Sequence, residues 1–118
     1  MDFQVEAFFE DKKEDKKEDK RWRVTLAGEV DIFSSTELRE KLIQLVKENP
    51  ADMHVDCQNL EYIDSTGLGA LVGVVKHIKS HNRAMHLFNV KPNILKLFHI
   101  TNLDKVFMIE GGASNEEA

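Results

Sequence analysis

The sequence predicts one α/β domain built around a mixed, mostly parallel sheet. Segments that alternate apolar and polar residues, as half-buried strands do, take turns along the chain with amphipathic segments of helical period. Their order is strand, strand, and then helix and strand three times. Strands joined through right-handed helical crossovers run parallel in the same sheet. At 118 residues the chain has the length of a single domain, which we expect over residues 1–110.

The first half of the chain predicts two strands and a helix. The segment FQVEAFFE (residues 3–10) is the first expected strand, and RWRVTLAG (residues 21–28) alternates apolar and polar residues as the second. A helix follows, in which Ser34 and Glu37 fit a capping box. Leucine and valine then recur with helical spacing until Asn49-Pro50, which predicts the end of this helix.

The second half predicts three more strands and two helices. Met53, Val55 and Cys57 alternate with polar residues in a strand over residues 53–58, so we expect Cys57 to be buried and unreactive. An amphipathic helix follows the segment YIDSTGLGALVG (residues 62–73). The remaining elements are a strand, a helix that starts at a proline, and a last strand: AMHLFNV (residues 84–90), the helix from Pro92, and KVFMI (residues 105–109).

Two charged segments fall outside this pattern. Residues 10–20, EDKKEDKKEDK, hold six acidic residues and five lysines with no apolar side chain to bury. We interpret them as a solvated loop inserted between the first two strands, with a salt-bridged helical extension as the alternative. Residues 111–118, GGASNEEA, predict a flexible acidic tail.

Composition argues against several classes of function. A net charge of −5, with lysines interleaved among acids, disfavours direct binding to nucleic acid. No apolar run approaches the roughly 20 residues that cross a bilayer, so we expect no membrane segment. The first residues lack the basic region of a secretory signal, and the single Cys57 cannot form an internal disulfide. These features favour a cytoplasmic protein.

The segment around Ser65 allows three interpretations, and two of them are weak. A hydrolase serine usually sits in a G-x-S-x-G elbow, which is absent here, and the five histidines fall on expected solvated surfaces. His77 and His81 have the spacing of metal ligands but lack the intervening Glu of a zinc protease motif. The glycines form neither a P-loop nor a dinucleotide fingerprint. We therefore predict no catalytic residue, no metal and no cofactor.

The third interpretation makes Ser65 a phosphorylation site. Ser65 precedes a helix and follows a strand, and Asp31 follows the neighbouring strand, so Asp31 and Asp64 should meet at one sheet edge. A phosphate there would add about −1.5 to −2 charges beside two carboxylates and would change the docking edge more than the fold. The simpler alternative is that Ser65 only caps the helix.

Three longer segments resemble a known family. LAGEVDIFSSTELREKL, NLEYIDSTGLGALVGVVKHIK and ILKLFHITNLDKVFMI, in this order and spacing, are similar to the bacterial anti-sigma factor antagonists, the single-domain members of the STAS family. The resemblance covers about residues 21–110 and is closest to the general-stress sigma-B antagonists. The charged segment 10–20 replaces a short turn and departs from the family pattern.

The resemblance implies a partner-switching regulator that is not itself an enzyme. The unphosphorylated antagonist would bind a serine kinase that also acts as the anti-sigma factor, and would thereby release the sigma factor. Phosphorylation of Ser65 by that kinase would end binding, a serine phosphatase would restore it, and ATP would belong to the kinase. Matching motif positions implies that the kinase contact is made by Asp31, Asp64, Thr66, Gly67, Leu68 and Gly69. The alternative is a STAS-type sensory or scaffold module that binds a small molecule or nucleotide.

Overall fold

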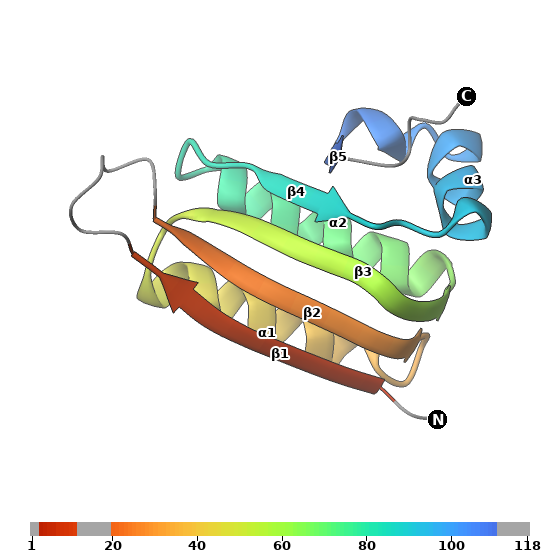
Figure 1. Ribbon diagram of the computed structural model, residues 1–118, viewed down its shortest axis with the longest axis horizontal. Helices are drawn as coiled ribbons and strands as arrows, with labels where there is room; N and C mark the ends of the chain where they lie inside the picture. The colour runs from red at the N-terminus through yellow and green to blue at the C-terminus, as the bar shows by residue number, and fades with distance from the viewer. Residues whose placement is uncertain (1–2, 12–19, 111–118) are drawn as a thin grey trace.

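A computed structural model describes residues 3–11 and 20–110, and within them the chain forms a five-stranded sheet in the order β1-β2-β3-β4-β5. The helices α1 and α2 lie behind one face of the sheet, and α3 lies beyond β4 near β5 (Figure 1). The predicted α/β fold class and the predicted order of elements are confirmed. The elements are β1 Phe3–Glu10, β2 Arg21–Val30, α1 Ser35–Glu48, β3 Asp52–Ile63, α2 Ser65–Lys79, β4 Met85–Phe88, α3 Pro92–Ile100, a short 3₁₀ helix Leu103–Lys105 and β5 Met108–Glu110.

The sheet is mixed, as the order of elements predicted. β1 pairs with β2 in antiparallel fashion, whereas β2–β3, β3–β4 and β4–β5 are parallel pairs. The antiparallel pair is the one whose connection contains no predicted helix. Because the four neighbouring strands β2 to β5 point the same way, the loops that follow β2 and β3 leave the sheet at the same edge.

Within residues 3–11 and 20–110, helices cover one face of the sheet and not the other. Along β2, Trp22, Val24 and Leu26 are buried, while Arg23 between them is exposed. β3 begins with the same alternation of buried and half-buried residues. The apolar stripes of α1 and α2 pack against the buried face, and the two helices contact each other. The opposite face therefore remains open and carries the polar half of each alternating strand.

The bounds of β2 and β4 differ from the prediction by one or two residues, and two further strands differ by more. β3 continues to Ile63 because it pairs with β2 as far as Val30, across two irregularities in register. The last strand is Met108–Glu110, not residues 105–109, because the chain first makes a 3₁₀ turn and then buries Phe107 against Phe98. Packing of this ring, which local alternation does not report, shifts the strand toward the C-terminus.

Three further expectations concern Cys57, the two charged segments and membrane-spanning helices. Cys57 is 2 % exposed, as predicted. The interpretations of the charged segment and of the acidic tail fall mostly on residues 12–19 and 111–118, which lie outside the described residues. Across residues 3–11 and 20–110, no helix combines the length and the apolar character needed to cross a membrane.

Candidate functional site

The two loops predicted to carry function start side by side. Val30 at the end of β2 pairs with Ile63 at the end of β3, and the backbone N–H of Asp64 donates to the carbonyl oxygen of Val30 at 3.2 Å. Asp31 is the next residue after Val30, so the two acidic residues leave the sheet from adjacent positions. The expectation that Asp31 and Asp64 share one sheet edge is confirmed.

Asp31 shapes the loop between β2 and α1. Its Oδ1 atom accepts hydrogen bonds from the backbone N–H groups of Phe33 at 2.9 Å and Ser34 at 3.2 Å. Ser34 precedes the helix, but its side chain makes no capping bond, so the predicted capping box with Glu37 is wrong. The Ser34 hydroxyl instead donates to the carbonyl oxygen of Glu29 at 3.0 Å, because the tight turn directs it back toward the end of β2.

Asp64, and not Ser65, caps α2. The backbone of Asp64 is extended, and its Oδ1 atom accepts from the backbone N–H groups of Thr66 at 3.0 Å and Gly67 at 3.1 Å. The same oxygen accepts a 2.6 Å hydrogen bond from the Thr66 hydroxyl. The Thr66 side-chain bond first, and then the Gly67 backbone bond, lower the pKa of Asp64 below its ordinary value of 3.8.

Ser65 therefore occupies the first helical position, which corrects the alternative in which its hydroxyl caps the helix. A capping residue needs non-helical backbone angles. Asp64, which directly follows β3 and precedes Ser65, has such extended angles. Ser65 is exposed, and within the described part of the chain its hydroxyl takes part in no hydrogen bond. It is thus an accessible hydroxyl at the positive end of a 15-residue helix.

The glycines of the motif have different structural roles. A Cβ atom on Gly67 would lie 2.6 Å from Ile63 Cγ1 and 2.7 Å from Val30 Cγ1, so Gly67 allows α2 to start against the ends of β2 and β3. At Gly69 a Cβ atom would meet nothing within 4 Å, and the position is exposed. Leu68 between them is 5 % exposed and packs in the core. Of the predicted contact residues, Leu68 thus presents little side-chain surface.

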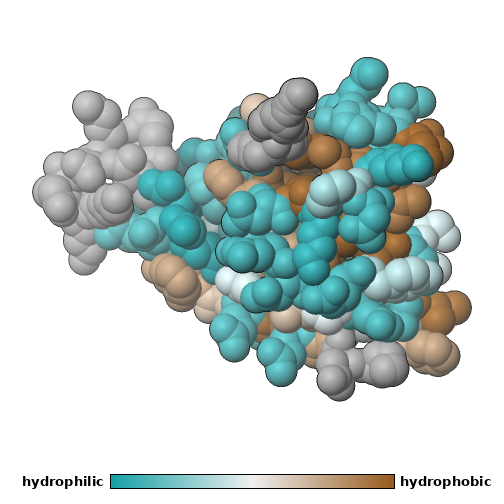
Figure 2. All heavy atoms as spheres, turned by 45° about the vertical axis from the view of Figure 1, so that its right-hand side comes forward, coloured by the Kyte–Doolittle hydropathy of each residue, from teal (hydrophilic) through white to brown (hydrophobic). Residues whose placement is uncertain are grey.

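Sequence reasoning missed an apolar pair at this edge. Ile32 and Phe33, directly after Asp31, are 65 % and 91 % exposed. Tyr62 at the end of β3 is 48 % exposed. Figure 2, in which this side of the molecule comes forward, shows hydrophobic atoms at its right-hand margin next to hydrophilic ones. The sequence did contain a signal for this pair, because Ile32 and Phe33 are consecutive apolar residues that fit neither the alternation of β2 nor the apolar stripe of α1.

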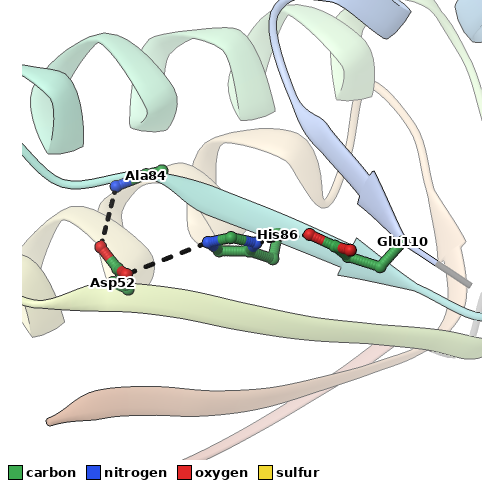
Figure 3. Close-up of polar contacts among 4 residues, drawn as sticks. All are labelled: Asp52, Ala84, His86 and Glu110. Atoms are coloured by element: carbon green, nitrogen blue, oxygen red, sulfur yellow. Dashed lines mark hydrogen bonds and ion pairs between the residues drawn. The ribbon is translucent and has the colours of Figure 1, made fainter. Parts of the chain in front are cut away.

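The histidines differ in part from the expected solvated positions. His86 on β4 is half-buried, with Nδ1 2.7 Å from Glu110 Oε2 and Nε2 3.9 Å from Asp52 Oδ2 (Figure 3). The rings of His77 and His81 lie edge to face, with centroids 5.3 Å apart. Among the described residues, no three His, Cys, Asp or Glu side chains are grouped so that they could hold a metal ion.

Comparison with known proteins places this edge in context. The chain is 38 % identical over 94 residues to the anti-sigma-B factor antagonist of Bacillus subtilis, covering 76 % of this chain and 85 % of the relative. It is 32 % identical over 116 residues to that of Staphylococcus aureus strain NCTC 8325, covering 98 % and 100 %. The solved anti-sigma factor antagonist SpoIIAA, in its unphosphorylated form, shares the fold with a TM-score of 0.69 at 20 % identity, over 95 % of this chain and 90 % of that one.

The family match agrees with the motifs and with the order of strands and helices. Residues 13–118 match the family described as STAS domain, which includes β2, the helix-capping Asp64 and every later element. Only β1 and the first part of the charged segment precede the match. The chain belongs to the STAS domain family.

Proposed function

We propose that this protein is an anti-sigma factor antagonist whose binding to its partner is controlled by phosphorylation of Ser65. One observation carries the proposal: Ser65 presents an exposed hydroxyl, with no hydrogen-bond partner among the residues that the structure describes, at the edge where Asp31 and Asp64 leave the sheet. Relatives named anti-sigma-B factor antagonist, 32–38 % identical over most of the chain, support the assignment. Its partner is an anti-sigma factor.

The electrostatics of the edge account for a switch that leaves the fold intact. A phosphate on Ser65 adds about −1.5 to −2 charges next to the Asp64 carboxylate. The N-terminus of α2 partly stabilises that charge, so the domain stays folded. A partner surface matched to the unphosphorylated edge meets an additional desolvated charge, and binding is lost. The SpoIIAA fold relative has been solved in both an unphosphorylated and a phosphorylated form.

The same edge offers apolar anchors for the partner. Phe33 holds almost its whole side chain in solvent, although burial of such a ring would be favourable by about 1.5–3 kcal/mol. Aromatic side chains surrounded by polar groups are frequent binding hot spots. We propose that Ile32 and Phe33 provide the apolar part of the contact surface. The polar part of that surface is formed by Asp31, Asp64, Thr66, Gly67 and Gly69.

The other roles in the cycle belong to separate proteins. We propose that the partner is a serine kinase that uses its own ATP, that a serine phosphatase reverses the reaction, and that the exchange occurs in the cytoplasm. This chain acts as substrate and regulator without catalysis. A nucleophilic role for Ser65 lacks support, since none of the hydrogen bonds in the described residues links its hydroxyl to a histidine.

The test compares two substitutions of Ser65 in binding to the purified anti-sigma kinase. Ser65→Ala should bind at least as tightly as the wild type and accept no phosphate. Ser65→Asp should fold normally but bind much more weakly, because a carboxylate imitates part of the phosphate charge. Both variants should unfold at nearly the wild-type denaturant concentration, since Ser65 makes no capping bond.

Thr66→Ala is the control for register. It removes the neighbouring hydroxyl, and mass spectrometry should still find phosphate on Ser65 after incubation with kinase and ATP. Phosphate on Thr66 in the wild type, or tight kinase binding by Ser65→Asp, would overturn the assignment.

A further inference from the structure

The face of the sheet that α1 and α2 leave open contains a cavity. It has a volume of about 370 Å³, within the range of small-molecule sites. The cavity lies over the first halves of β2 and β3, whereas Ser65 follows the end of β3. Its lining residues are Phe8, Arg21, Arg23, Val24, Thr25, His54, Asp56, Phe88 and Asn89.

One wall of the cavity is aromatic and held in place. The ring of His54 lies 5.2 Å from that of Phe88 and 4.8 Å from that of His86. His86 is positioned in turn by Glu110 on one side and Asp52 on the other, and Asp52 also accepts from the backbone N–H of Ala84 at 3.1 Å (Figure 3). Contacts across three strands therefore fix the wall before any ligand arrives, which limits the entropy lost on binding.

The opposite wall holds two guanidinium groups that share one carboxylate. Glu10 Oε1 lies 3.1 Å from Arg21 Nε and 3.7 Å from Arg23 Nη1. The closer pair lacks hydrogen-bond geometry, and Glu10 does not line the cavity. Half of the Arg23 side chain is exposed. Burial is the largest cause that lowers the pKa of His54 on the facing wall. The two guanidinium groups carry one positive charge more than the single Glu10 carboxylate neutralises, so an anion near Arg23 is attracted.

A third group of side chains supplies polar contacts at the far end. Asp56 Oδ1 accepts from the Gln58 backbone N–H at 2.9 Å and from the Asn89 side chain at 3.1 Å. These bonds hold Asp56 on the side of the cavity away from Glu10, in register with Thr25 and Phe88. The negative charge of Asp56 is thus separated along the strands from the two arginines, which gives the cavity a cationic end and a polar end.

We propose that this cavity binds a small ligand that combines a planar aromatic ring with one anionic group, either carboxylate or phosphate. The ring stacks on the wall formed by His54 and Phe88, and the anion contacts the guanidinium of Arg23. Stacking selects planar ligands, and charge selects anions. The site is independent of the switch at Ser65, and its occupancy can be measured without any partner protein.

The test is an NMR titration of the ¹⁵N-labelled chain with four probes: 2-naphthyl phosphate, 2-naphthoate, 2-naphthalenemethanol and inorganic phosphate. The two aromatic anions should shift the amide signals of β2, β3 and β4 around the cavity with saturation. The ring alone and the anion alone should bind about tenfold more weakly or worse, since each lacks one of the two interactions. The affinities of 2-naphthyl phosphate and 2-naphthoate, compared with each other, show whether the cavity prefers phosphate or carboxylate.

Three variants of residues in or beside the cavity should change the affinity for the probes, two by weakening it and one by strengthening it. Arg23→Gln should weaken the aromatic anions by about tenfold, and Glu10→Gln should strengthen them, because it frees both guanidinium groups from their shared carboxylate. Phe88→Leu should weaken every probe that carries a ring.

Two control variants remove the same kinds of group, one positive charge and one aromatic ring, at positions outside the cavity. Lys41→Gln on α1 removes one positive charge from the other side of the sheet, and Phe33→Leu removes a ring at the Ser65 edge; neither should alter binding. Saturable shifts centred on residues 32–33, equal binding of naphthalenemethanol and the anions, or unchanged affinity in both Arg23→Gln and Glu10→Gln would overturn the proposal. So would the absence of shifts at millimolar probe.

Discussion

The Thr66 hydroxyl donates a 2.6 Å hydrogen bond to the Asp64 carboxylate, and this bond distinguishes two adjacent hydroxyl groups that look equivalent in the sequence. Thr66 is held inside the capping arrangement of α2, whereas the Ser65 hydroxyl stays free among the described residues. A kinase that needs a hydroxyl with no internal partner would find it at Ser65. The capping arrangement thus engages the Thr66 hydroxyl and leaves the Ser65 hydroxyl accessible to a partner.

The ionised form of Asp64 should stabilise the fold above pH 3.8 and lose this effect in acid. Its pKa in the folded protein is lowered, so the unfolded state takes up a proton first as the pH falls below 3.8. The difference in unfolding free energy between the wild type and Asp64→Asn should therefore shrink toward acid pH. Urea unfolding at a series of pH values measures it.

Thr66→Val serves as the control for this effect, because its hydroxyl is the largest cause of the lowered pKa. In that background the pH dependence attributable to Asp64 should be smaller. A difference between wild type and Asp64→Asn that stays constant through the acid range would contradict the role of Asp64 as an ionised cap.

Gly67 and Gly69 should respond oppositely to alanine. Gly67→Ala forces a methyl group against Ile63 and Val30 and should destabilise the fold by about 1–3 kcal/mol. Gly69→Ala meets open space and should be neutral or stabilise the helix by up to about 1 kcal/mol. Chemical denaturation measures both changes.

Binding separates the structural role of Gly69 from its proposed contact with the partner. If the partner approaches the backbone at Gly69, Gly69→Ala should bind the anti-sigma factor more weakly although it is at least as stable as the wild type. Unchanged binding by Gly69→Ala would remove this residue from the interface.

Phe33 should contribute to partner binding without contributing to stability. Because its side chain is 91 % exposed, Phe33→Ser removes almost no buried area in the free protein and should leave the unfolding midpoint unchanged. If the ring becomes buried on binding, calorimetry should show affinity for the anti-sigma factor reduced by about tenfold or more.

Ile100 on α3 provides the matched control, since it is 67 % exposed but belongs to a helix that carries none of the predicted contact residues. Ile100→Ser should bind like the wild type. Equal losses in the two variants would indicate a general effect of surface hydrophobicity and not a defined anchor.

Cys57 should react slowly with thiol reagents in the native protein. Burial is the main cause that raises the pKa of its thiol to about 12, so little thiolate forms at mildly alkaline pH. Labelling by a chromogenic disulfide should become rapid in urea. The comparison variant combines Cys57→Ala with Gln58→Cys, which moves the thiol to an exposed position on the same strand and should label quickly when folded.

Local patterns in the sequence were sufficient for most of the fold. Alternation and helical spacing depend only on neighbouring residues, and they located all three helices and the mixed character of the sheet. The start of α3 at Pro92 is one example, because proline suits the first turn of a helix wherever that helix packs. The motif around Ser65 likewise indicated the correct sheet edge, since the carboxyl ends of parallel strands must emerge together.

Other features depended on contacts between distant residues. Pairing with β2 extends β3 to Ile63, which makes Asp64 the capping residue and places Ser65 at the first helical position. Packing of Phe107 against Phe98 delays the last strand.

The sequence by itself determined the fold class, the helices and the edge that carries Ser65, because these follow from the periodicity of nearby side chains. Only the tertiary structure decided which hydroxyl bonds the Asp64 carboxylate, that Phe33 is exposed to solvent, and that Arg23, His54 and Phe88 line one cavity on the open face. These three side chains come from different strands. Strand register brings them together, and register is fixed by long-range pairing and core packing that no local pattern encodes.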